Sequence, residues 1–164
     1  MHAREASLVT SAFQRLRKIP GLHILADEAE DRLGVFSFYL DGVHHNLLVR
    51  LLNDRYGIQV RGGCSCAGTY GHYLLEVNKV LSKKITDAVD RGDLRLKPGW
   101  IRLSLHPTMT DQELDYILDA IEEVSRDIKQ LEKDSTYSGD LNEFFHRSVP
   151  PKKARDFASW FEWE

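Results

Sequence analysis

Residues 100–124 read WIRLSLHPTMTDQELDYILDAIEEV, and this stretch decides the fold class. Its first six residues alternate in polarity, as in a strand, where successive side chains point to opposite faces. The apolar face carries Ile101, Leu103 and Leu105, and the polar face carries Arg102 and Ser104. The stretch therefore predicts a strand that covers a core with one face and presents a guanidinium group on the other.

The second half of the stretch predicts a helix that packs on this strand. Thr110, followed three residues later by Glu113, matches a capping box, in which each residue satisfies a backbone N–H of the other. Apolar residues then recur at helical spacing: Leu114, Ile117, Leu118, Ile121, Val124 and Ile128. A half-buried strand followed by a helix with one apolar face indicates a layered fold.

The rest of residues 1–134 repeats this pattern of short strands and amphipathic helices. The predicted elements are a helix that ends at Pro20-Gly21, strands over 22–25, 34–40 and 58–61, a helix over 46–56, and one helix over 74–89. Together they predict an α/β (α+β) two-layer sandwich, with about four short, mostly antiparallel strands and helices on one face. No glycine-rich phosphate loop follows a strand, which disfavours a doubly wound nucleotide-binding sheet.

Residues 135–164 are predicted to form a tail. It begins with a linker over residues 135–140 and ends in a segment that contains Phe157, Trp160, Phe161 and Trp163. Two interpretations of this aromatic end stand side by side: it docks on the domain's own surface, or on a partner or a missing domain.

Composition excludes several classes of function. The 164 residues carry a net charge of -3, which gives no electrostatic reason to bind nucleic acid or an anionic membrane. The apolar runs are too short to cross a bilayer, and the first residues do not resemble a signal peptide. A cytoplasmic location is therefore expected.

The densest chemical cluster is Arg61-Gly62-Gly63-Cys64-Ser65-Cys66. A disulfide between the two cysteines is not expected, because Cα atoms two residues apart on a strand lie roughly 6.6 Å from each other. One interpretation is a reactive thiol, since a nearby cation favours the nucleophilic thiolate. The other is a pair of small buried hydrophobes. A metal site that adds His72 is not expected, because structural zinc sites use wider cysteine spacing.

Two further side chains, Arg102 and His45, are candidates for a functional role. Arg102 could hold a carboxylate by two parallel hydrogen bonds, or it could simply face an acidic residue on the surface. His45 begins the predicted helix after His44, and we expect it to cap that helix or face solvent.

Taken together, residues 4–128 resemble the small C-terminal domain of class V pyridoxal-phosphate (PLP) enzymes, especially the cysteine desulfurase and selenocysteine lyase branch. The segment from Arg61 to Cys66 looks like the family's Arg-Thr-Gly-His-His-Cys, with Cys64 and Ser65 in place of the two histidines. The resemblance makes Cys66 the candidate sulfur acceptor, with Cys64 second. It makes Arg102, together with Arg61, the candidate grip for the substrate carboxylate.

The resemblance also implies PLP as the cofactor of the complete enzyme. The family places its cofactor lysine in a Ser/Thr-x-His-Lys setting, and no lysine of this chain follows a histidine. We therefore expect no cofactor-binding residue here, no bound cofactor, and no activity without the PLP-binding large domain, from the same gene or a separate chain. An amino-acid substrate, a homo-oligomer and an exposed apolar patch are also expected. The alternative is a non-enzymatic protein-interaction module derived from the same fold.

Overall fold

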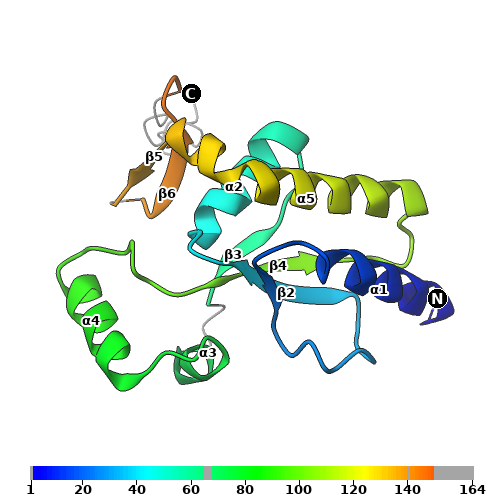
Figure 1. Ribbon diagram of the computed structural model, residues 1–164, viewed down its shortest axis with the longest axis horizontal. Helices are drawn as coiled ribbons and strands as arrows, with labels where there is room; N and C mark the ends of the chain where they lie inside the picture. The colour runs from blue at the N-terminus through cyan, green and yellow to red at the C-terminus, as the bar shows by residue number, and fades with distance from the viewer. Residues whose placement is uncertain (1, 65–67, 140, 150–164) are drawn as a thin grey trace, which may run out of the picture.

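A computed structural model describes residues 2–64, 68–139 and 141–149 of the chain (Figure 1). The helices are α1 (His2–Leu16), α2 (His45–Tyr56), α3 (Gly68–Leu74), α4 (Lys79–Asp90) and α5 (Asp111–Lys133). The strands are β1 (Leu22–Ile24), β2 (Val35–Leu40), β3 (Arg61–Gly63), β4 (Trp100–Ser104), β5 (Ser135–Ser138) and β6 (Glu143–His146). No helix of this described part is long and apolar enough to cross a membrane.

A four-stranded antiparallel sheet carries the core on one face. Its strand order is β1-β2-β4-β3, so β3 lies at an edge beside β4. Phe36 lies opposite Leu103 and Phe38 opposite Ile101 in the central strand pair, and all four side chains are buried. Helices α1, α2 and α5 lie over this sheet (Figure 1) and supply most of the remaining core. The predicted two-layer fold is confirmed.

Helix α5 begins as its sequence predicts. The Thr110 hydroxyl accepts a hydrogen bond from the backbone N–H of Glu113, and the Glu113 carboxylate accepts one from the backbone N–H of Thr110. Arg15 of α1 then pairs with the α5 carboxylates of Asp119, at 2.5 Å, and Glu122, at 3.3 Å. These contacts tie the first helix of the chain to the last.

Two predicted elements differ from the structure. The strand expected over 58–61 pairs with β4 only from Arg61 to Gly63, because residues 58–60 run beside α2 instead, where the Ile58 N–H bonds the Leu52 carbonyl. The helix expected over 74–89 begins only at Lys79, as α4, and its first predicted residue, Leu74, is instead the last residue of a separate helix, α3. Glu76 takes a left-handed backbone conformation there, and the Asn78 side chain caps α4 by accepting from the Leu81 N–H.

The stretch predicted to be a linker is part of a β-hairpin. Strand β5 pairs with β6, and Tyr137 of β5 lies opposite Phe144 of β6. Both rings pack against His44 at the start of α2, with centroid distances of 5.7 and 5.4 Å. This packing against α2 orders the segment, which its own composition does not indicate. The aromatic end at 157–163 lies outside the described residues.

Candidate functional site

Arg61 and Arg102 lie directly opposite each other on strands β3 and β4. Directly opposed residues of an antiparallel pair project to the same face, with Cβ atoms about 5 Å apart. The neighbouring Gly62 faces the helices, since a Cβ added there would lie 2.9 Å from Val49 Cγ2 of α2. The two guanidinium groups therefore share the face of the sheet opposite α2.

Neither of these two guanidinium groups has a carboxylate partner within the described part of the chain. The arginines that form ion pairs there are others: Arg4, Arg15, Arg17, Arg50, Arg95 and Arg126. Like charges directly opposite each other destabilise a sheet. The uncompensated pair therefore favours an anionic ligand, and planar guanidinium groups match carboxylates in particular.

Hydroxyl groups extend this open face across the sheet. Ser37 of β2 lies opposite Arg102, so a row of polar side chains crosses three strands from Ser37 to Arg61. Tyr39 lies two residues further along β2 and stacks on His23, with centroids 4.9 Å apart. Partial burial, followed by the charge of Asp41, raises the pKa of Tyr39, so its phenol stays protonated and can donate a hydrogen bond.

Of the two candidate thiols, the structure describes only Cys64. It follows β3 immediately and is half-buried. It lines a small, mostly apolar pocket of about 180 Å³ with His72, Ile85 and Pro98, among other residues. Cys66, the predicted sulfur acceptor, lies outside the described residues. Within the described ranges, no three His, Cys, Asp or Glu side chains form a group that could hold a metal ion.

Gly71 brings helix α3 onto the open face of the sheet near these residues. A Cβ added to Gly71 would lie 3.4 Å from the Trp100 ring and 3.8 Å from the Cys64 Cβ. The close approach buries Trp100 at the end of β4. The structure therefore places Arg61 and Arg102 at one end of the β3–β4 ladder and Cys64 just past its other end, which α3 borders.

The structure contradicts the expectation for His45. His44 caps α2, its Nδ1 accepting from the Asn46 N–H at 3.1 Å, whereas His45 is 7% exposed, the one buried polar side chain among the described residues. Its ring lies between two glycines: added Cβ atoms would approach it to 3.1 Å at Gly62 and 2.6 Å at Gly99. Burial, followed by the charges of His44 and Lys97, lowers the pKa of His45 to about 4.

Sequence reasoning missed His45 because burial of a histidine depends on contacts with distant parts of the chain. The signal that could have found it is indirect. Gly62 lies within β3 and Gly99 directly precedes β4. A glycine in or beside a strand often marks a close approach of another group.

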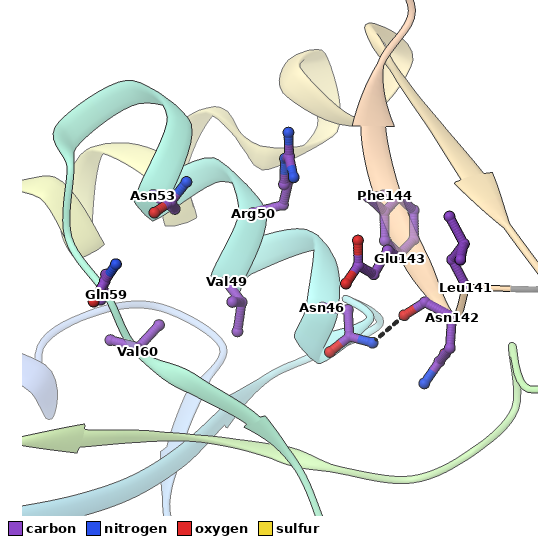
Figure 2. Close-up of a pocket in the computed structure, with 10 residues that line it drawn as sticks. All are labelled: Asn46, Val49, Arg50, Asn53, Gln59, Val60, Leu141, Asn142, Glu143 and Phe144. Carbon is purple, nitrogen blue, oxygen red and sulfur yellow. Dashed lines mark hydrogen bonds between the residues drawn. The ribbon is translucent and has the colours of Figure 1, made fainter. Parts of the chain in front are cut away.

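A larger hollow lies elsewhere, between α2 and the β5–β6 hairpin (Figure 2). It has a volume of about 550 Å³. Figure 2 shows Asn46 and Asn142 at one end of it, joined by a hydrogen bond of 2.5 Å from the Asn46 amide to the Asn142 carbonyl. Neither arginine of the opposed pair nor Cys64 lines it. We therefore place the candidate site on the open face of the sheet.

Comparison with known proteins identifies sequence relatives of this chain. A probable cysteine desulfurase of Halobacterium salinarum is 33% identical over 66 residues, which make up 40% of this chain and 16% of that protein. A cysteine desulfurase of Haloferax volcanii is 29% identical over 101 residues, 55% of this chain and 24% of that protein. The chain thus corresponds to about a quarter or less of the length of these relatives.

Solved structures show the same similarity. The cysteine desulfurase CsdA of Escherichia coli matches with a TM-score of 0.50 and 25% identity, over 77% of this chain and 25% of that one. The apo cysteine desulfurase of Thermococcus onnurineus matches with a TM-score of 0.50 and 23% identity, over 76% of this chain and 26% of that one, and supports the fold alone. The sequence pattern of the family Aminotransferase class-V matches residues 1–117. Because this match covers most of the chain, the protein belongs to the class-V aminotransferase family.

Proposed function

We propose that the chain is the substrate-side small domain of a PLP-dependent class V enzyme of the cysteine desulfurase-like type. In this role Arg102, with Arg61 beside it, holds the carboxylate of an amino-acid substrate. The observation that carries the proposal is the opposed arginine pair, which shares one open face of the sheet and has no carboxylate partner within the described residues.

The energetics of such a grip are favourable. A hydrogen bond to a charged group contributes about 1.5–3 kcal/mol net, and a guanidinium can make two parallel bonds to one carboxylate. A carboxylate between the two guanidinium groups would also relieve their mutual repulsion. Ser37, in the same row of side chains, supplies a further hydrogen-bonding group.

The cofactor would be held by residues other than those of this chain. PLP supplies an electron sink for chemistry at the amino-acid carbon when it is bound through a lysine. The lysines of α4 are a poor fit for that task, since Lys83 pairs with Asp87 at 3.1 Å on an exposed helix and Lys79 and Lys84 line the same open surface. We therefore assign the cofactor to a large domain outside these 164 residues, so that the chain alone is inactive.

Sulfur transfer is one reaction open to such an enzyme. We propose Cys66 as the acceptor, with Cys64 as the less favoured candidate. Support comes from the sequence likeness to the family's cysteine segment and from Arg61, whose positive charge favours a nearby thiolate. Replacement of the family's two histidines by Cys64 and Ser65 changes the charge of the loop and leaves amino transfer as the competing reaction.

A large domain or a second copy of the chain would cover the apolar side chains near the site. Tyr70 and Tyr73 of α3 are 62% and 79% exposed and stack on each other, and Val80 of α4 is 82% exposed. Exposed apolar side chains that lie together, as Tyr70 and Tyr73 do, commonly mark an interaction surface. The same surface supports the alternative, a non-enzymatic interaction module.

The carboxylate grip can be tested on the chain itself by NMR titration with propionate. We expect the Arg61 and Arg102 side-chain signals to shift on binding, and Arg102→Gln to abolish the shifts. Arg126→Gln is the matched control, because it removes one positive charge that already has a partner, Asp127, on α5. Shifts that persist in Arg102→Gln would refute the grip.

A second experiment tests the division of the enzyme. The chain is purified alone and after co-expression with the large domain of a class V relative, and PLP absorbance and alanine release from cysteine are measured. We expect both only in the complex, and loss of sulfur transfer in Cys66→Ser. A stable complex with a cellular protein that has no PLP absorbance would favour the interaction module.

A further inference from the structure

The buried imidazole ring of His45 occupies a narrow slot beside Gly62 and Gly99. His45 is the first residue of α2, and its ring lies close to Gly62 of β3 and to Gly99, the residue that leads into β4. A Cβ on Gly99, the residue before β4, would lie 2.6 Å from both Cε1 and Nδ1 of the ring. A Cβ on Gly62 in β3 would lie 3.1 Å from its Cδ2.

The slot is shaped for a flat ring between bare backbones. The Cβ position of Gly99 is also only 3.0 Å from the Cα of Gly63, so the two chain segments approach each other closely beside the imidazole. The ring also stacks on His44, with centroids 4.4 Å apart and planes 24° apart. Movement of either strand end is therefore resisted by contacts on more than one side of the ring.

The location of the slot relates it to the candidate site. Gly62 lies opposite Ile101 and Gly63 opposite Trp100, and the next pair along the two strands is Arg61 opposite Arg102. Cys64 follows Gly63 directly. The ring lies on the helix side of the sheet, whereas the arginines project from the other side, so His45 cannot touch a ligand held by them.

We propose that His45 is a positioning residue, which holds the end of β3 against the entry to β4 and thereby fixes the spacing of Arg61, Arg102 and Cys64. The importance of this spacing rests on the proposed carboxylate grip, but the mechanical role of the ring does not. Burial of a histidine costs more free energy than burial of a leucine or a phenylalanine. The fit of a planar, five-membered ring between Gly62 and Gly99 accounts for the buried histidine at this position.

The test compares His45→Ala, the double variant His45→Ala/Gly99→Ala, and His106→Ala as an exposed-histidine control. Amide hydrogen exchange is measured at residues 61–63 and, as an internal reference, at Leu118 and Ile121 of α5. In His45→Ala we expect exchange at 61–63 to rise by about tenfold or more while the α5 amides change little. The methyl group that Gly99→Ala introduces enters part of the space vacated by the His45 ring. The double variant should therefore recover part of the protection from exchange.

Three outcomes would overturn the inference. These are unchanged exchange at 61–63, an equal rise at 61–63 and in α5, or no recovery in the double variant. Propionate titration of the same proteins separates this inference from the proposed function. If Arg102 holds carboxylates, His45→Ala should bind propionate more weakly. If the Arg102→Gln titration shows that Arg102 does not hold carboxylates, the hydrogen-exchange data still decide the role of His45.

Discussion

Arg61 and Arg102 face each other across β3 and β4 at the distance of directly paired residues, and their charges are not balanced by any carboxylate of the described residues. A binding site often retains such a conflict at the expense of stability, because the ligand resolves it. The free chain should therefore be less stable with the pair than without it.

Replacement of Arg61 should stabilise the ligand-free chain. We expect Arg61→Gln to raise the free energy of unfolding by about 0.2–1 kcal/mol, the usual range for a cross-strand pair, and Arg61→Glu to raise it further. Urea denaturation measures the change, and added salt should reduce it because these groups are accessible to solvent. Arg126→Gln, which breaks an existing pair with Asp127, should give no such gain; an equal gain there would point to a general effect of net charge.

Gly99→Ala should destabilise the protein through His45. Gly99 does not adopt a left-handed backbone, so the cost arises from the 2.6 Å overlap with the ring. We expect a loss of about 2 kcal/mol, and a double variant with His45→Ala that is less destabilised than the sum of the single changes by about 1–2 kcal/mol. Gly139→Ala is the control, since no described atom lies within 4 Å of its added Cβ. Additive effects in the cycle would show that the two residues are not coupled.

Acid should destabilise the protein in a pH range set by His45. The pKa of His45 falls from 6.5 in the unfolded chain to about 4 in the folded one, so the unfolded chain binds the proton first. The contribution of His45 to stability is therefore fully present above pH 6.5 and is lost as the pH falls through 4, by about 3 kcal/mol in all. His44, whose pKa burial also lowers, acts in the same direction.

Denaturation at a series of pH values checks this prediction, with His45→Gln as the variant that lacks the group. The slope between pH 6.5 and 4 should be shallower in the variant. Carboxylates with lowered pKa, such as Asp93 and Asp127, contribute only from their ordinary value of 3.8 downward, so their effect falls in a separate window. Identical slopes in both proteins would mean that His45 is not buried as described.

The capping box of α5 should contribute measurably to stability. Thr110→Ala removes the oxygen that accepts from the Glu113 N–H at 3.2 Å, and we expect a loss of about 1 kcal/mol in chemical denaturation. Thr10→Ala, within the exposed part of α1, removes a hydroxyl that bonds only the Ala6 carbonyl and should cost much less. Equal losses would assign the effect to the threonine side chain in general.

The parts of the fold that the sequence predicts correctly depend on local patterns. Strand β4, helix α2 and the capped start of α5 follow from alternation, apolar periodicity and capping residues within a few positions of each other. The bounds of β3 depend on where β4 begins, and the break at Glu76 interrupts a periodicity that continues into α4. Those features arise from contacts between distant residues, which a local pattern does not contain.

In the candidate site, too, residue types are predictable from the sequence, whereas contacts between distant residues are not. Arg61 and Arg102 could be selected from their residue types and neighbours, but their direct opposition depends on the register of two strands separated by α3 and α4. His45 could not be selected, because its partners Gly62 and Gly99 offer no side chain to signal the contact.

The β5–β6 hairpin alters where this polypeptide can be divided. The family match ends at residue 117, inside α5, and the hairpin lies beyond it, yet Tyr137 and Phe144 shield the His44 ring on which His45 stacks. A truncation guided by homology would cut a helix in two and leave that imidazole pair uncovered. A shortened chain that keeps this packing has to extend through β6, to His146.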